Sequence, residues 1–250
     1  MATDFQASAE AMKDQLKTIS PSFCSAKWLM TTLHLENGQT HSCFLPQSHA
    51  IPLEGLAENP AQLHNTPHKL ARRKEMLEGV KPEECSLCWQ VETNGGLSDR
   101  FYRSGEAWAA PELGRIARLP WNEMVNPRHL EVSFGSQCNF KCSYCSPMIS
   151  SKWREEIRSQ GPYPIDGSFH NDLSWLREQN ENPHFPSEDN PYIDAFWKWW
   201  PSLYKELKVV RLTGGEPLLN KNTFRVFDWI RENPKPDLKL AITTNLCMPS

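Results

Sequence analysis

The chain of 250 residues lacks long apolar runs and any large excess of charge of one sign. No segment approaches the roughly 20 apolar residues that a membrane-spanning helix needs. Residues 1–20 carry Asp4, Glu10 and Asp14 where a secretory signal would have its apolar core. The net charge of −3 creates no broad basic field to favour nucleic acid or a membrane surface. We therefore expect a cytoplasmic protein whose partners are neither nucleic acids nor membranes.

Eight cysteines occur in spaced groups. Without a secretory signal, such groups indicate metal ligation and not a disulfide framework. Seven of the cysteines form one group of three and one group of four: Cys138, Cys142 and Cys145, and Cys24, Cys43, Cys85 and Cys88. The eighth, Cys247, follows a predicted strand, and we expect a thiol of the core or of a loop there.

The group of three lies on one loop after a strand-like segment, residues 130–134. The loop reads Cys138-Asn139-Phe140-Lys141-Cys142-Ser143-Tyr144-Cys145. Thiolates are soft ligands that select zinc, copper(I) or iron–sulfur clusters. Three of them on a short loop can bind three irons of a cubane and leave the fourth iron open to a small molecule. A zinc site completed by a distant ligand, or a set of buried thiols, is the alternative, although zinc sites usually combine two closely spaced pairs.

A pair of glycines follows the next strand-like segment, residues 207–212. The run is Leu212-Thr213-Gly214-Gly215-Glu216-Pro217. Glycine allows a backbone to approach a ligand closely because it has no Cβ, although a plain turn would explain these glycines taken alone. Found in this order, each at the end of a strand, the two motifs resemble those of the radical S-adenosylmethionine (radical SAM) superfamily.

The resemblance implies a chemistry and a set of contacts. Cys138, Cys142 and Cys145 would bind a [4Fe–4S] cluster whose open iron holds S-adenosylmethionine. Reductive cleavage of that cofactor would give a 5′-deoxyadenosyl radical that abstracts hydrogen from a substrate, with a small electron donor of the flavodoxin or ferredoxin type. No catalytic residue and no substrate follow from it, and a peptide is suggested only by analogy. The implied cofactor contacts are Phe140, Tyr144, Gly214, Gly215, Glu216, Thr244 and Asn245.

The group of four surrounds a predicted hairpin and a predicted helix. Asn37-Gly38 is a strong hairpin signal, and Thr66-Pro67 predicts the start of a helix that ends at Gly79. Four thiols satisfy either structural zinc or a fully ligated [4Fe–4S] cluster, so the ligand number leaves both open. The arrangement resembles the SPASM and twitch modules of radical SAM enzymes, although those modules more often follow the barrel. It implies a second [4Fe–4S] cluster.

Strand and helix patterns alternate in the second half of the chain. Predicted strands at 130–134, 207–212 and 238–244 are separated by helices that begin at Asn190-Pro191 and at Asn222. This alternation predicts a parallel sheet with right-handed crossovers and with ligands at the carboxyl ends of the strands.

We therefore predict an α/β fold with three parts. Residues 129–250 would form the N-terminal half of a radical SAM barrel, with about three strand–helix units. A cysteine-rich α+β auxiliary-cluster domain over 1–90 and a bridging segment over 91–128 would precede it. Barrels of the family contain more units, and a half-barrel exposes a sheet edge, so we expect an enzyme fragment that could lack activity alone. The competing hypothesis is a non-catalytic zinc-binding adaptor with two structural cysteine sites.

Overall fold

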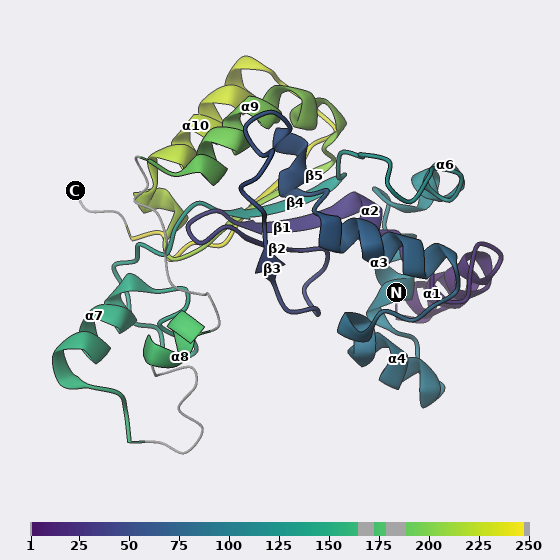
Figure 1. Cartoon of the computed structure of the whole chain (residues 1–250), viewed down its shortest axis with the longest axis horizontal. Helices are drawn as coiled ribbons and strands as arrows, with labels where there is room; N and C mark the ends of the chain where they lie inside the picture. The colour runs from purple at the N-terminus through teal and green to yellow at the C-terminus, as the bar shows by residue number, and fades with distance from the viewer. Residues whose placement is uncertain (1, 165–172, 179–188, 248–250) are drawn as a thin grey trace.

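One mixed sheet organises the fold in a computed structural model that describes residues 2–164, 173–178 and 189–247. The strand order is β3-β2-β1-β4-β5-β6 (Figure 1). The strands are β1 (Met30–His34), β2 (Gln39–His41), β3 (His49–Ala50), β4 (His129–Ser133), β5 (Val209–Thr213) and β6 (Lys239–Ile242). The helices are α1 (Ala2–Lys17), α2 (Ala26–Leu29), α3 (Pro67–Leu77), α4 (Ser86–Thr93), α5 (Asp99–Gly105), α6 (Leu113–Ile116), α7 (Ser151–Gln160), α8 (Leu173–Glu178), α9 (Pro191–Glu206) and α10 (Lys221–Glu232).

The strands β1, β4, β5 and β6 are neighbours and run parallel, whereas β2 is antiparallel to both β1 and β3. The strands predicted at 130–134, 207–212 and 238–244 correspond to β4, β5 and β6, and the parallel sheet expected there is confirmed. Their carboxyl ends therefore meet at one edge of the sheet, where the loops after β4, β5 and β6 begin.

The hairpin of the cysteine-rich segment belongs to this same sheet. β1 pairs with β4 from Met30 opposite His129 to His34 opposite Ser133. Leu33 lies beside Val132 in this register, and both side chains are completely buried in the core that α9 covers. Burial of this apolar side of β1 holds the hairpin against the sheet. The division of the chain at residues 90 and 128 stays a prediction.

The helix α9 covers one face of the sheet for reasons visible in its sequence. The side chain of Asn190 accepts hydrogen bonds from the backbone N–H groups of Tyr192 (2.9 Å) and Ile193 (3.2 Å), which caps the helix. Phe196 and Trp200 are fully buried one turn apart and form part of the core with the apolar side chains of β4 and β5. The aromatic stripe is therefore a packing surface.

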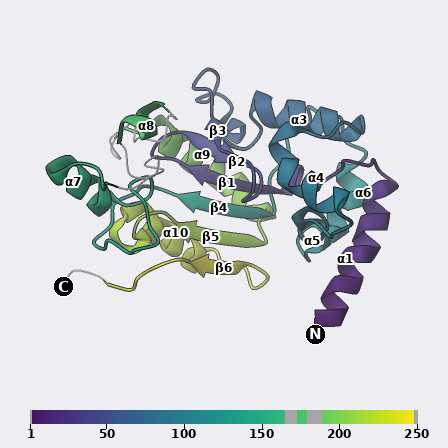
Figure 2. The same ribbon diagram turned by 90° about the horizontal axis from the view of Figure 1, so that it is seen from below.

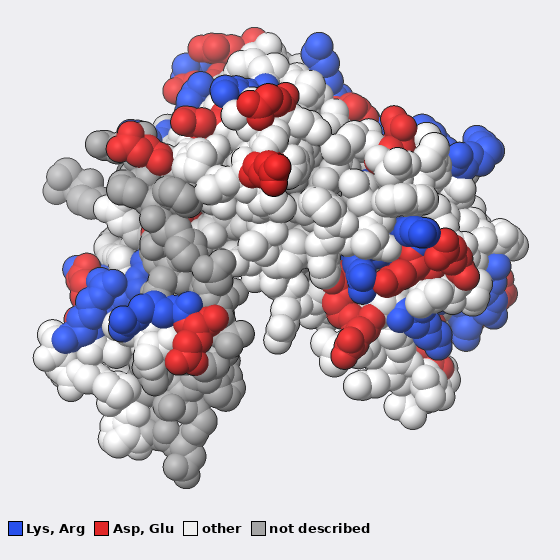
Figure 3. Space-filling model, viewed as in Figure 1, with Lys and Arg blue, Asp and Glu red and all other residues white. Residues whose placement is uncertain are grey.

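Helices gather at both ends of the parallel strands. Figure 2 shows α1 and α3–α6 at one end of the sheet, and α7 and α8 at the other. A second core lies at the first of these ends, where Phe23, Trp28, Met76 and Phe101 are at most 1% exposed. In the described part of the chain, no helix is long and apolar enough to cross a membrane. Acidic and basic side chains are interspersed over the face that Figure 3 shows, in agreement with the small net charge.

Candidate metal centres

The loop between β4 and α7 carries the group of three cysteines. All three thiols are free and partly exposed. The backbone N–H of Phe140 donates to Sγ of Cys138 (3.5 Å). Burial raises the pKa of Cys145, and the nearby thiols of Cys142 and Cys138 raise that pKa further. The three sulfur atoms are thus close enough to act on one another electrostatically.

The first turn of α7 holds this loop in place. Ser151 Oγ accepts a hydrogen bond from the backbone N–H of Cys138 (3.1 Å), and Ser150 Oγ donates to the carbonyl of Phe140 (3.1 Å). The indole N–H of Trp153 donates to the carbonyl of Cys142 (3.1 Å). Three side chains of one helix end therefore fix the backbone between the first two cysteines.

The glycine turn after β5 packs directly against the start of the cysteine loop. The N–H of Gly215 donates to the carbonyl of Gly135 (3.2 Å), and that of Glu216 donates to the carbonyl of Gln137 (2.7 Å). A Cβ on Gly214 would lie 2.5 Å from the Gly135 oxygen, and one on Gly215 would lie 2.3 Å from the Gln137 oxygen. Gly214 also has a φ of +123°, which side-chain-bearing residues rarely adopt. The backbones approach so closely that only glycine fits at either position.

The end of β6 joins these two loops. Thr244 and Asn245 both donate hydrogen bonds to the carboxylate of Glu216, which is only 2% exposed.

The two aromatic residues of the cysteine loop are exposed. Phe140 and Tyr144 are 43% and 89% exposed, and a hydrogen bond to Cys142 raises the pKa of the Tyr144 phenol. The structure thus brings the predicted cofactor contacts to the carboxyl end of the parallel strands. Their roles toward a cofactor stay predictions.

Two residues of this edge carry contacts that the sequence did not reveal. Asn139, between the first two cysteines, donates to the carbonyl of Cys247 (2.6 Å) and accepts from the side chain of Asn245 (2.9 Å). Cys247 is exposed in the loop after β6. An Asn inside a CxxxC spacing gives no signal of its own, because its partners come from a segment more than 100 residues away.

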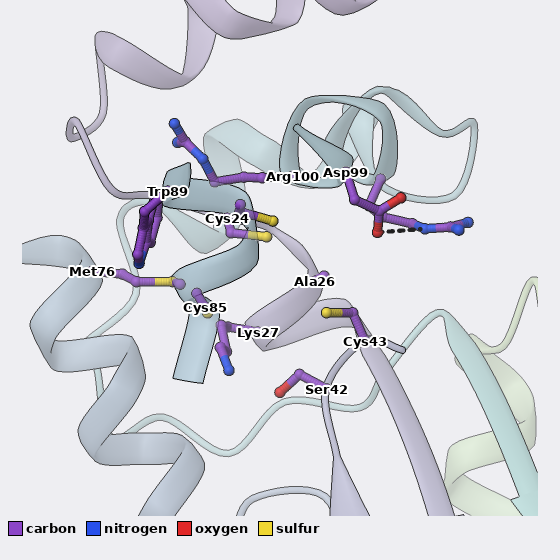
Figure 4. Close-up of a pocket in the computed structure, with 12 residues that line it drawn as sticks. Cys24, Ala26, Lys27, Ser42, Cys43, Met76, Cys85, Trp89, Asp99 and Arg100 are labelled. Carbon is purple, nitrogen blue, oxygen red and sulfur yellow. Dashed lines mark hydrogen bonds and ion pairs between the residues drawn. The ribbon is translucent and has the colours of Figure 1, made fainter. Parts of the chain in front are cut away.

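The group of four lines a small cavity at the other end of the sheet (Figure 4). Cys24 precedes α2, Cys43 follows β2, and Cys85 and Cys88 lie on a 3₁₀ turn and on the following helix α4. Cys24, Cys85 and Cys88 are less than 10% exposed. Burial raises the pKa of the Cys24 thiol, and the nearby thiols of Cys43 and Cys85 add to the effect.

Hydrogen-bond donors and cations surround these thiols. Backbone N–H groups of Ala26, Leu45 and Arg100 donate to the sulfur atoms of Cys24, Cys43 and Cys88, respectively. The nearly buried cations Lys27 and Arg100 also line the cavity, each paired with a carboxylate, Glu84 and Glu92. The N–H donors and the two cations each favour the thiolate form that binds metal. Sequence alone gave no sign of these cations, since their burial arises from tertiary packing.

The chemistry of the donor sets fits a metal at both places, because thiolates are soft metal ligands. In the ranges that the structure describes, no three His, Cys, Asp or Glu side chains already stand in a metal-binding arrangement. The fit of the first group to a [4Fe–4S] cluster rests on three thiols sharing one loop beside a glycine turn. The fit of the second group rests on four thiols lining one cavity with N–H donors.

The two groups of thiols lie at opposite ends of the sheet. Cys24 and Cys43 are attached where β1 begins and β2 ends, beside the amino end of β4. The other group follows the carboxyl end of β4. The first and last Cα atoms of β1 are about 13 Å apart, at roughly 3.3 Å for each of the four steps between its five residues, so about the length of this strand separates the two groups.

Comparison with known proteins gives a consistent but partial match. No family model matches the chain, and no solved structure does. The chain is similar to proteins named GTP 3′,8-cyclase from Nautilia profundicola (31% identity over 117 residues), Aliarcobacter butzleri (31% over 121) and Campylobacter lari (27% over 119). Each match covers 47% of this chain and 27% of the relative.

These relatives belong to the radical SAM enzymes, so the similarity supports that superfamily for this chain. The mixed α/β fold with its parallel sheet is compatible with part of a radical SAM barrel. The matched segment amounts to about a quarter of the length of the relatives. The comparisons leave the SPASM or twitch subgroup unconfirmed.

Proposed function

We propose that this chain performs radical SAM chemistry with a [4Fe–4S] cluster bound by Cys138, Cys142 and Cys145. The observation that carries the proposal is the direct packing of the glycine turn after β5 on the cysteine loop after β4. The similarity to GTP 3′,8-cyclases across 47% of the chain adds independent support. When bound, the cluster and S-adenosylmethionine supply a 5′-deoxyadenosyl radical that abstracts hydrogen from the substrate.

The residues of the chain would bind the cluster and orient the cofactor beside it. The three thiolates hold the cluster, and the first turn of α7 fixes the loop that carries them. The carbonyls of Gly214 and Gly215 accept no hydrogen bond from the described residues, so they can accept from the amino group of the cofactor. Phe140 and Tyr144 are exposed beside the loop and would pack on the adenine.

The test is electron paramagnetic resonance on anaerobically reconstituted, dithionite-reduced protein, with and without S-adenosylmethionine. We expect a cluster signal that shifts when the cofactor is added. Cys142→Ala should abolish the shifting signal, whereas Cys247→Ser should keep it, because Cys247 is exposed and outside the group of three. Zinc in place of iron, with no response to the cofactor, would refute the proposal and favour the adaptor hypothesis.

We further propose a second [4Fe–4S] cluster at Cys24, Cys43, Cys85 and Cys88, with structural zinc as the competing occupant. Four thiols with N–H donors around one cavity support a four-thiolate metal site. Metal analysis of the double variant Cys85→Ser/Cys88→Ser distinguishes the two. Loss of about four irons per chain, the content of one such cluster, supports iron–sulfur, and loss of one zinc supports the alternative.

The substrate and the electron donor are further proposals. A peptide substrate and a flavodoxin- or ferredoxin-type donor come by analogy with radical SAM enzymes, and the names of the relatives make GTP the competing substrate. Release of 5′-deoxyadenosine by the reduced, reconstituted protein measures turnover. Release that requires a peptide supports a peptide substrate. Release that requires GTP refutes the peptide and supports GTP as the substrate.

A further inference from the structure

Glu216 is a buried carboxylate that accepts hydrogen bonds from the loops after β5 and β6. Its Oε1 accepts from the backbone N–H of Leu218 (2.9 Å) and from the hydroxyl of Thr244 (2.7 Å). Its Oε2 accepts from the backbone N–H of Asn245 (2.7 Å). The residue is 2% exposed, and none of these three donors is a cation. Oε1 therefore has no lone pair left for a ligand.

A second set of bonds extends this contact to the cysteine loop. The side-chain N–H of Asn245 donates to Oδ1 of Asn139 (2.9 Å), and its Oδ1 accepts from the backbone N–H of Cys247 (2.8 Å). Asn139 in turn donates to the carbonyl of Cys247 (2.6 Å). The loops after β4, β5 and β6 are thus joined by one continuous network of side-chain hydrogen bonds.

We infer that Glu216 is a positioning residue: its carboxylate fastens the end of β6 to the glycine turn and, through Asn245 and Asn139, orders the loop of Cys138 and Cys142. This inference rests on the proposed function, in which that loop binds the cluster. The backbone carbonyls of the glycine turn are then the groups left to face the cofactor, while both oxygens of Glu216 accept hydrogen bonds from the chain itself. The end of β6 becomes a required part of the site without contacting the cofactor.

The charge of Glu216 and its connections to neighbouring loops give it this role. Hydrogen bonds to an ionised group are stronger than those between neutral groups, and a buried carboxylate without a cation depends on them for its stability. Removing one donor therefore weakens the network at a point remote from the cysteines. From Thr244 and Asn245 the effect reaches residues 138–142 through Asn139, which bonds to both Asn245 and Cys247.

The experiment compares Thr244→Val with Thr244→Ser. Valine has the shape of threonine without its hydroxyl, whereas serine keeps the donor to Glu216. Hydrogen exchange on the full chain before metal is added reports the order of residues 138–142 and 244–247. We expect Thr244→Val to speed exchange in both segments by about tenfold or more, the size expected for one lost bond to a charged group. Thr244→Ser should exchange like the parent chain.

A second readout uses the reconstituted protein. The concentration of S-adenosylmethionine that half-shifts the paramagnetic signal should rise about tenfold in Thr244→Val and return toward the parent value in Thr244→Ser. Glu216→Gln should have a similar effect, because it removes the negative charge and one of the two acceptor oxygens that bind Thr244 and Asn245. Combining it with Thr244→Val should add little, since both substitutions weaken the same network. Additive effects of the two substitutions would count against a shared role.

The contrary outcome is specific. If Thr244→Val leaves exchange and cofactor affinity unchanged while Glu216→Gln abolishes the shift, then Glu216 contacts the cofactor directly and the inference is wrong. If the parent chain shows no response to the cofactor but Thr244→Val still loosens residues 138–142, the proposed function fails and the positioning role stands.

Discussion

Gly215→Ala tests how closely the glycine turn must approach the cysteine loop. The added Cβ would lie 2.3 Å from the carbonyl oxygen of Gln137 and 2.5 Å from that of Ser136, whereas real Cβ contacts essentially never fall below 3.0 Å. The backbone of one loop would therefore have to move by roughly 0.7 Å or more. Both obstacles are backbone atoms, which cannot rotate away as a flexible side chain can.

The cost follows from overpacking. Forcing an extra methyl group into a filled site costs about 1–3 kcal/mol, and the lower entropy of the unfolded alanine chain offsets about 0.4–1 kcal/mol of it. A net loss of about 1–2 kcal/mol lowers Tm by about 2–8 °C for a chain of this size. Because the hydrogen bond from Gly215 to Gly135 lies at the same contact, we also expect a weaker paramagnetic response to S-adenosylmethionine.

Gly114→Ala is the matched control. The nearest atom to a Cβ at Gly114, which lies in α6, is 4.0 Å away at the tip of the Arg118 side chain. This variant should keep or slightly raise Tm, because alanine favours a helix over glycine. Calorimetry measures the Tm of both variants and tests these expectations. Equal Tm values, with an unchanged cofactor response in Gly215→Ala, would refute the close-approach argument.

Three further predictions concern the support of the site. Trp200→Ala should cost about 3–5 kcal/mol in urea denaturation, because Trp200 is fully buried; Trp200→Phe should cost less, since its indole N–H bonds to no described residue. Asn190→Ala should cost about 1–2 kcal/mol in the same assay, because it removes the cap of α9 and a bond to the carbonyl of Leu35. Burial lowers the pKa of His129 from 6.5 to about 4. As the pH falls, His129 therefore takes up a proton in the unfolded chain before it does so in the folded chain. Stability should fall as the pH drops from about 6.5 toward 4, and His129→Phe should lose part of that dependence when denaturation is compared at pH 7 and pH 5.

Local sequence signals predicted the elements that carry the candidate site. The strands β4, β5 and β6 lie within a few residues of the predicted segments, because apolar runs bounded by loops are local signals. The start of α9 followed from Asn190-Pro191, since both the cap and the proline act on the first turn. The glycine pair was informative for the same reason, because glycine is the one residue without a Cβ and therefore indicates a close backbone approach.

Contacts between distant segments could not be predicted in this way. The pairing of β1 with β4 joins Met30 to His129 across almost 100 residues, and an apolar alternation does not say which neighbour a strand chooses. The bonds of Asn139 to Asn245 and Cys247 depend on three loop ends meeting at one edge. Lys27 is nearly buried beside the thiols, against the usual exposure of lysine, and only the tertiary packing shows this.

The placement of the two thiol groups limits what one molecule can reach. The strand pair β1–β4 extends between them for about 13 Å, and core side chains pack on one side of it. A ligand the size of a single amino acid or nucleobase, held at the carboxyl end of β4, is too short to touch Cys24 or Cys43. A metal held by the four cysteines could therefore not be a direct ligand of such a substrate during its reaction at the first group.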